Sequence, residues 1–410
     1  MNRDQIAELE KRVLIPTYDR LPILAVGGEG CYIYDDTGKK YLDFLGGLAV
    51  NSLGYNHPEI MATLRDDAEN LLHVSNLLYH PFQAPLAEKL TRLSGMDRAF
   101  FANSGTEAIE GAMKLVRAYA RKHSPQGPFE RFEILALENS FHGRTFGALS
   151  ATWPKKYREP FEPLPPGVRF VRLNDTAHLR QSFTPQVAAV LLEVIQGEGG
   201  IVEIREDFLK AAAELCHTHG ALLICDEIQC GLGRTGRMFA YTKFGLRPDV
   251  VVVAKPLAAG LPLAAILASE EVAQAFSPGM HGTTFGGGPL QCRVALQVLE
   301  ILERPGFLAH VSEVGVYFRQ ELEKLRANLP VIQEVRGDGL MMGVELTTAG
   351  KFVVRKALES GLLMNCTQEN VLRFLPPLII EKQHVDEAIG ILRPVLAAFE
   401  PAAAMKGATA

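Results

Sequence analysis

Short, continuous apolar runs recur through the middle of the chain, and they constrain its fold more than any other feature. Such runs, rich in Val, Ile, Leu and Ala, are typical of strands that helices cover on both faces. Between two of them, Ile109, Ala112, Met113, Val116 and Ala120 form a helical stripe, and residues 207–218 predict a helix that Gly220 ends. We therefore expect an α/β fold with a mostly parallel sheet flanked by helices. The expected strands are 98–102, 132–137, 187–194, 221–225, 250–254 and 263–268.

The C-terminal part has a different pattern, which predicts a second, smaller domain. Apolar stretches at 331–335 and 340–346 flank Arg336-Gly337-Asp338-Gly339, a hairpin signal. We expect a large α/β domain over 61–299 and a smaller α+β domain over 300–399. The N-terminal segment 1–60 is expected to pack with the smaller domain, and the tail 400–410 to be frayed.

Charge and cysteine use exclude several classes of protein. The net charge is -5 and no Lys/Arg block is present, which argues against nucleic-acid and membrane-surface partners. The N-terminus lacks the apolar run of a secretory signal. Six cysteines without a Cys-x-x-Cys pair predict free thiols in a reducing compartment, so we expect a cytoplasmic protein.

Two features could mislead. Residues 250–269 carry one charge, Lys255, as a membrane span would, but Pro256, Gly260 and Pro262 favour strand, turn and strand. Cys216, His217 and His219 could suggest a metal site. No second ligand pair accompanies them, so we expect the polar end of a helix and no metal.

Three features suggest chemistry. Residues 103–107 follow an expected strand and open a helix, where free amides suit a phosphate; a plain cap with the Ser104–Glu107 capping-box spacing is the alternative. Asp226 ends a strand, where open α/β sheets bind ligands, but a structural ion pair is equally compatible. Lys255 also lies at a strand end, and desolvation would favour its nucleophilic free amine; a lysine that only extends to solvent is the alternative.

The segment Gly231-Leu232-Gly233-Arg234-Thr235-Gly236 fits a dinucleotide-binding pattern, which keeps a nicotinamide oxidoreductase open as an alternative. However, five residues separate its glycines from the preceding strand, and no clear helix follows. The match is therefore weak.

Taken together, the ordered motifs resemble the class III (ornithine/acetylornithine) aminotransferases, which are fold-type I pyridoxal-phosphate enzymes. The likeness extends from about residue 17 to residue 394. Departures occur at Pro256-Leu257-Ala258-Ala259-Gly260, where the family usually has glycines, and at Gly288, where it often has Asn; they put substrate preference in doubt. The motifs that carry the likeness are residues 100–107, 140–145, 195–200, 226–236, 282–287 and 370–377.

The resemblance assigns roles around pyridoxal 5′-phosphate. Lys255 would carry the cofactor covalently and move a proton, while Asp226 would bind the pyridine nitrogen. Phe141 and Ile228 would pack on the two faces of the ring. The other cofactor contacts would be Gln229, Ser104, Gly105, Thr106 and His142, together with Thr284 of the partner subunit of a homodimer.

The resemblance also implies a reaction. The terminal amine of N2-acetyl-L-ornithine would pass to 2-oxoglutarate, giving N-acetyl-L-glutamate 5-semialdehyde and L-glutamate. Ornithine, succinylornithine and 4-aminobutyrate remain alternative donors, and a non-catalytic binding protein on the same fold also remains open. Arg144 and Thr283, with help from Tyr18, would bind the distal end of the donor. Arg373 would bind the carboxylate of glutamate, and Glu198 would pair with Arg373 in the other half-reaction.

Overall fold

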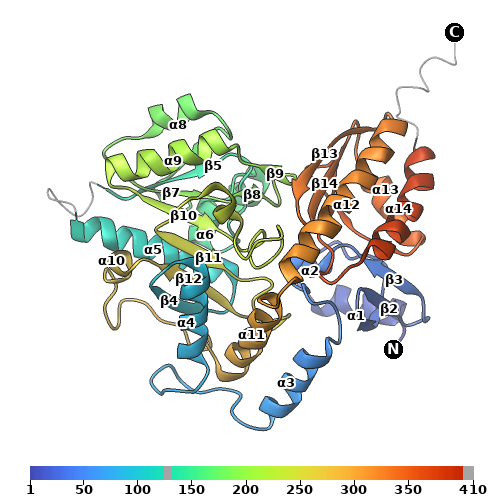
Figure 1. Ribbon diagram of the computed structural model, residues 1–410, viewed down its shortest axis with the longest axis horizontal. Coiled ribbons are helices and arrows are strands. Elements are labelled where there is room, and N and C mark those ends of the chain that lie inside the picture. Colours follow the sequence, from blue (N-terminus) through green and yellow to red (C-terminus); the bar gives the residue numbers. More distant parts are fainter. Residues whose placement is uncertain (124–130, 400–410) are drawn as a thin grey trace.

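The computed structural model describes residues 1–123 and 131–399, so the predicted frayed tail lies outside the described residues (Figure 1). A seven-stranded sheet forms the centre of the larger part. Its strands, in order across the sheet, are β4 (Arg98–Ala102), β12 (Ala264–Ala268), β11 (Val250–Val253), β10 (Leu222–Asp226), β7 (Val187–Leu192), β5 (Glu133–Leu137) and β6 (Val168–Val171).

This sheet confirms the expected mostly parallel architecture. Neighbouring strands from β11 to β6 are parallel, whereas β12 runs antiparallel to both of its neighbours. The six expected strands are present to within two residues at each end. The analysis of the sequence missed β6, because Val168-Arg169-Phe170-Val171 is short and carries a charge.

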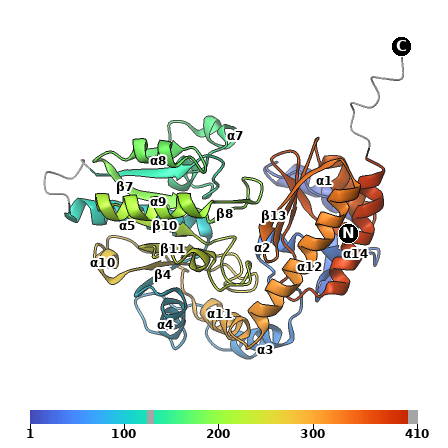
Figure 2. The same ribbon diagram turned by 45° about the horizontal axis from the view of Figure 1, so that its top comes forward.

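The strands of this sheet are buried on both faces, which explains their unbroken apolar sequences. Leu222 and Ile224 of β10 belong to the core formed with α5 (Gly105–His123), whereas Leu223 and Cys225 belong to the core formed with α9 (Glu206–His219). Since successive side chains of a strand point to opposite faces, α5 and α9 cover opposite faces of the sheet (Figure 2). As expected, α9 ends at Gly220, whose φ of 62° is left-handed.

A second, four-stranded sheet lies in the C-terminal part, beside α12 (Phe307–Asn328), α13 (Lys351–Glu359) and α14 (Lys382–Ala397) (Figure 1). The predicted hairpin is present as antiparallel β13 and β14, paired from Ile332 with Leu346 to Asp338 with Met341. The strands, in order, are β13 (Ile332–Asp338), β14 (Met341–Leu346), β17 (Val371–Phe374) and β16 (Asn365–Thr367).

The N-terminal segment joins the C-terminal part through a third sheet. Leu42 of β3 pairs in parallel with Leu362 of β15, although the two residues are far apart in sequence. This pairing supports our proposal that residues 1–60 pack with the smaller domain. The strands of this sheet, in order, are β1 (Ala25–Glu29), β2 (Tyr32–Asp35), β3 (Lys40–Asp43) and β15 (Leu362–Leu363).

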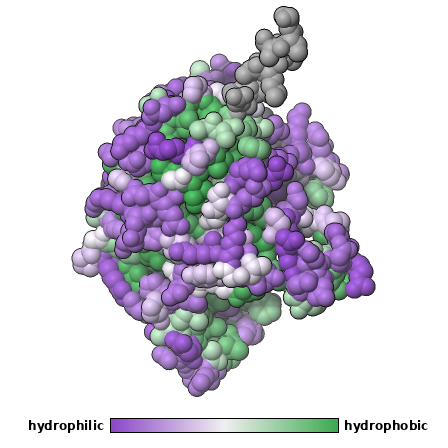
Figure 3. Space-filling model, turned by 90° about the vertical axis from the view of Figure 1, so that its right-hand side faces the viewer, coloured by the Kyte–Doolittle hydropathy of each residue, from purple (hydrophilic) through white to green (hydrophobic). Residues whose placement is uncertain are grey.

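The other elements are short or connect these sheets. In the described part of the chain, no helix is long and apolar enough to cross a membrane. The face that carries the C-terminal helices shows mainly hydrophilic side chains, with apolar areas between them (Figure 3). The remaining elements are α1 (Arg3–Val13), α2 (Gly46–Ala49), α3 (Pro58–Ala68), α4 (Gln83–Ser94), α6 (Phe146–Ser150), α7 (Lys155–Arg158), η1 (Glu159–Phe161), α8 (Thr176–Ser182), β8 (Ile195–Gln196), β9 (Val202–Glu203), η2 (Ala240–Phe244), α10 (Glu270–Ala273) and α11 (Pro289–Leu302).

Candidate active site

A cavity of about 250 Å³ lies at the carboxyl ends of β10 and β11. Asp226 ends β10 and Lys255 follows β11, so two parallel neighbours deliver both side chains to one edge of the sheet. Except for Gly143 and Glu193, every lining residue is one that the sequence singled out. The lining residues are Gly105, Thr106, Phe141, His142, Gly143, Arg144, Glu193, Glu198, Asp226, Ile228, Gln229 and Lys255.

Lys255 is half-buried in this cavity. Burial lowers the pKa of its amine, an effect that the nearby Glu198 carboxylate partly opposes and the Arg373 guanidinium reinforces. A lowered pKa increases the fraction of neutral amine near pH 7. Only the neutral form can attack a carbonyl carbon, so the environment favours a nucleophilic role.

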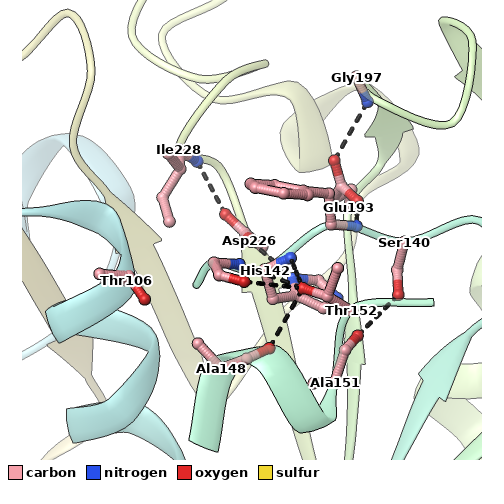
Figure 4. Close-up of polar contacts among 12 residues, drawn as sticks. Thr106, Ser140, His142, Ala148, Ala151, Thr152, Glu193, Gly197, Asp226 and Ile228 are labelled. Atoms are coloured by element: carbon pink, nitrogen blue, oxygen red, sulfur yellow. Dashed lines mark hydrogen bonds and ion pairs between the residues drawn. The ribbon is translucent and has the colours of Figure 1, made fainter. Parts of the chain in front are cut away.

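Asp226 is held by two hydrogen bonds inside the cavity wall (Figure 4). Its Oδ2 lies 2.7 Å from His142 Nδ1, and its Oδ1 accepts from Ile228 N at 3.0 Å. An ionised carboxylate can only accept hydrogen bonds, so His142 Nδ1 carries the proton of this contact. Each carboxylate oxygen keeps a free lone-pair direction, which allows Asp226 to accept one more hydrogen bond.

Glu193 is a cavity residue that the sequence analysis missed. Its Oε1 accepts from Phe141 N at 2.9 Å and its Oε2 from Gly197 N at 3.1 Å, which ties together two loops of the cavity (Figure 4). Burial raises the pKa of this carboxyl. The sequence contained a signal for Glu193, namely a carboxylate at the end of an apolar strand. Glu193 directly follows β7, and Asp226 ends β10 in the same way.

The loop after β5 is held in place by Thr152, a residue that no sequence pattern identified. The Thr152 hydroxyl accepts from His142 N at 3.0 Å and Gly143 N at 3.3 Å, and it lies 3.2 Å from Ala148 O (Figure 4). This hydroxyl therefore fixes the backbone on both sides of His142 against α6. Phe141 and Arg144 project from the same stretch of backbone.

The predicted phosphate loop opens α5, but its cap differs from the expected capping box. Ser104 Oγ accepts weakly from Glu107 N at 3.4 Å, whereas the Glu107 carboxylate reaches Asn103 N at 2.7 Å instead of Ser104 N. Gly105 packs closely against Ile228, since a Cβ there would lie 2.8 Å from Ile228 Cδ1. The first-turn amides have no helical acceptor and can bind an anion.

The side chain of Thr106 serves a neighbouring loop. Its Oγ1 accepts from Arg144 N at 3.2 Å and Thr145 N at 3.3 Å, and it bonds Thr145 Oγ1 at 2.9 Å. The backbone amide of Thr106 can therefore bind a phosphate. Its hydroxyl meanwhile holds the loop that carries Phe141, His142 and Arg144.

Arg373 reaches the cavity from β17 of the C-terminal part and pairs with Glu198. Arg373 Nη1 lies 2.6 Å from Glu198 Oε1, and the arginine is 1% exposed. A further bond runs from Arg373 Nε to Asn365 Oδ1 at 3.1 Å. Although burial raises the pKa of Glu198, the opposing effect of Arg373 is large enough to leave it lowered, so Glu198 stays ionised.

Five predicted substrate or cofactor residues are not among those that line this cavity: Ser104, Arg373, Thr283, Thr284 and Tyr18. Thr283 Oγ1 accepts from Asn103 Nδ2 and Gly286 N, both at 3.2 Å, and Thr284 is exposed beside it. Tyr18 is 81% exposed, between α1 and β1. Their roles stay predictions. The glycines of residues 231–236 form turns that lead to η2, without the strand–helix junction of a dinucleotide site.

Comparison with known proteins gives one consistent family. The family model described as aminotransferase class-III matches residues 14–396. Acetylornithine aminotransferase of Methanocaldococcus jannaschii is 48% identical over 395 residues, covering 96% of this chain and 98% of that protein. The protein of the same name from Aquifex aeolicus is 49% identical over 384 residues, covering 93% and 99%.

Solved structures agree with this family. Ornithine aminotransferase of Toxoplasma gondii has a TM-score of 0.93 and 32% identity, covering 97% of this chain and 96% of that one. Acetylornithine aminotransferase of Elizabethkingia anophelis has a TM-score of 0.87 and 31% identity, covering 97% and 100%.

Proposed function

The chain belongs to the class III aminotransferases, which use pyridoxal 5′-phosphate, and we propose that it transfers the terminal amine of N2-acetyl-L-ornithine to 2-oxoglutarate. The products are N-acetyl-L-glutamate 5-semialdehyde and L-glutamate, in arginine biosynthesis. One observation carries the choice of donor: relatives named acetylornithine aminotransferase are 42–49% identical over nearly the whole chain.

The cavity fits the cofactor. The free amides at the start of α5 suit a ring phosphate, and Asp226 retains an acceptor for a pyridine N–H. Phe141 and Ile228 line the same cavity as apolar walls. When bound, the cofactor supplies a carbonyl that condenses with amines and a ring that accepts electrons from the reacting carbon.

Lys255 has two tasks in this proposal. Its neutral amine would hold the cofactor, and its Nζ would take and return the proton of the carbon that bears the transferred amine. The lowered pKa of Lys255 supports both tasks. Asp226, oriented by His142, would hold the ring nitrogen and favour its protonated form.

Arg373 and Glu198 allow one cavity to serve two different substrates. Glutamate carries a carboxylate next to its reacting amine, and Arg373 binds that group through its planar fork. The donor has no carboxylate at this place, and an unpaired buried arginine is costly. Glu198 fills the place in that half-reaction, and its ion pair with Arg373 at 2.6 Å supports this exchange.

This exchange predicts an asymmetry between the half-reactions. Arg373→Ala is expected to slow the glutamate half by on the order of 10²-fold, because a charge-assisted bidentate contact is lost, and to change the acetylornithine half far less. Glu198→Ala leaves Arg373 without its partner, so donors that react through an α-amine should gain relative to acetylornithine. Single-turnover rates measure both effects. Equal slowing of the two halves by Arg373→Ala would mean that Arg373 serves the fold or the cofactor instead.

A panel of half-reactions tests the proposed function. Acetylornithine, ornithine, succinylornithine and 4-aminobutyrate are each mixed with the yellow enzyme, and bleaching of its absorbance is recorded. We expect the fastest bleaching with acetylornithine, without added nicotinamide. Faster bleaching by one of the other donors reassigns the substrate, and the absence of turnover with every donor contradicts an enzymatic role.

We further propose a homodimer in the cytoplasm, with active sites shared between subunits. Thr284 and the adjacent Phe285 are exposed. Asn76 Nδ2 donates to the backbone oxygens of Thr283 and Gly286, and Asn76 lies in an exposed apolar segment. An apolar patch of this kind indicates an interface, and a two-fold axis would bring Thr284 toward the other subunit. The exposed residues of that segment are Leu71, Leu72, Leu77, Leu78 and Tyr79.

The state of the cysteines supports the proposed compartment. All six cysteines are free, which is typical of a reducing compartment such as the cytoplasm.

Complementation between inactive subunits checks the shared site. Co-expressed Lys255→Ala and Thr284→Ala chains should form hybrids with one intact site and one doubly impaired site. These hybrids should be more active than either parent dimer, because the intact site takes Lys255 and Thr284 from different chains. An active monomer in light scattering, or hybrids that gain nothing, would contradict the arrangement.

A further inference from the structure

The guanidinium of Arg144 is held at the cavity by aromatic rings. Its Cζ lies 3.8 Å from the centroid of the Tyr157 ring and 5.6 Å from that of Phe141. Both distances are within the range of a cation–π contact. Among the described residues, the Arg144 side chain has neither a hydrogen bond nor an ion pair, and the residue is exposed in the cavity wall.

Contact with aromatic rings leaves the N–H donors of Arg144 available for a substrate. The N–H donors of a guanidinium lie in its plane, whereas a ring contacts the face of that plane. Tyr157 can therefore restrict the orientation of the fork without occupying any of its donors. A carboxylate binds such a fork through two parallel hydrogen bonds, so orientation decides how well it is bound.

The backbone fixes Tyr157 relative to Arg144. Trp153 N donates to Ser140 O at 2.9 Å, and Ser140 Oγ donates to Ala151 O at 2.9 Å. The Thr152 hydroxyl adds its bonds to the loop amides that precede Arg144 (Figure 4). The segment that leads into α7, and hence to Tyr157, is thus joined to the loop that carries Phe141 and Arg144.

We propose that Tyr157 is a positioning residue for substrate binding by Arg144. Its ring orients the Arg144 fork toward the distal carboxylate of the amino donor, while Tyr157 itself does not line the cavity. Glutamate also carries a carboxylate far from its reacting amine, so Tyr157 is expected to act on the binding of both substrates and not on the reacting groups. This inference rests on the proposed function of the cavity, and in particular on donor binding by Arg144.

Half-reaction kinetics of Tyr157 variants test the proposal. Tyr157→Leu should raise the acetylornithine concentration needed for half-maximal single-turnover rate by about 3- to 30-fold, from the loss of a cation–π contact. The limiting rate should stay within about twofold with either substrate, because the reacting groups are untouched. Tyr157→Phe keeps the ring and should restore wild-type donor binding.

The chain offers a matched control close by. Arg158 Cζ lies 4.9 Å from the centroid of the Phe170 ring, in a similar cation–π contact outside the cavity. Phe170→Leu should leave donor binding unchanged, even where it lowers the urea midpoint of unfolding. A loss of donor affinity in Phe170→Leu equal to that in Tyr157→Leu would overturn the proposal, since general loosening of this segment would then explain both.

A double-mutant cycle gives a second measurement that does not depend on the recovery of Tyr157→Leu alone. Arg144→Lys keeps the charge but loses the planar fork, and the Tyr157→Phe and Tyr157→Leu changes are each combined with it. The ring should matter little once the fork is gone, so the two losses should be far from additive. Additive losses, or a lower limiting rate without a loss of donor affinity in Tyr157→Leu, overturn the inference.

Failure of the underlying function would look different. If Arg144→Ala leaves acetylornithine binding unchanged, then Arg144 is not the donor site and the proposed role of this arginine is wrong. If Arg144→Ala weakens donor binding but Tyr157→Leu does not, the donor site stands and only the positioning role of Tyr157 is wrong.

Discussion

Replacing Lys255 by alanine is expected to remove nearly all turnover while the chain still folds. The side chain is half-buried at the end of β11, and shortening it leaves the strand pairing of β11 with β10 and β12 intact. The variant loses both the covalent bond to the cofactor and the proton carrier, so a loss on the order of 10⁴-fold or more is expected. Steady-state assays and the absorbance of the purified protein measure the two losses.

Two comparisons make the Lys255 result specific. Lys210→Ala removes an exposed lysine of α9, paired with Glu206, and should leave turnover unchanged. Small primary amines added to Lys255→Ala should restore part of the rate, because they can replace the missing proton carrier. Wild-type turnover by pure Lys255→Ala would refute the assignment of this cavity as the active site.

Replacing Asp226 by alanine is expected to slow both half-reactions by on the order of 10³-fold. The carboxylate is 3% exposed and holds His142 Nδ1 at 2.7 Å, so its loss leaves a buried donor unpaired as well as the ring nitrogen of the cofactor. Losing the charge that favours a protonated ring nitrogen raises the barrier by about 4 kcal/mol, which corresponds to this change in rate. Asp226→Asn separates charge from geometry, since it keeps the shape of the side chain.

Asp249 provides the matched control for Asp226. It precedes β11 at the other end of the strands and accepts from Leu223 N at 2.7 Å. Asp249→Ala should lower the urea midpoint of unfolding without a specific loss of single-turnover rate. A fast Asp226→Ala enzyme, with yellow colour and both half-reactions intact, would show that this carboxylate is only structural.

Much of the fold could be predicted from the sequence, because its elements are specified locally. A strand buried on both faces must be apolar without alternation, so runs such as Val250–Val253 identify themselves. Asp226 and Lys255 could be found for a related reason. A charge at the end of an apolar run meets solvent or a ligand at the carboxyl edge of a parallel sheet.

The sequence by itself therefore determined the mostly parallel sheet and, through the ordered motifs, the family and its cofactor. Only the tertiary structure showed that Glu193 joins the loops of Phe141 and Gly197, that Glu107 reaches Asn103, and that the Tyr157 ring lies against Arg144. These residues lie in loops, at the ends of elements or in short helices, whose paths have no periodic signal. Which of their polar atoms meet is decided by hydrogen-bond geometry that exists only after the strands have paired and the loops have closed.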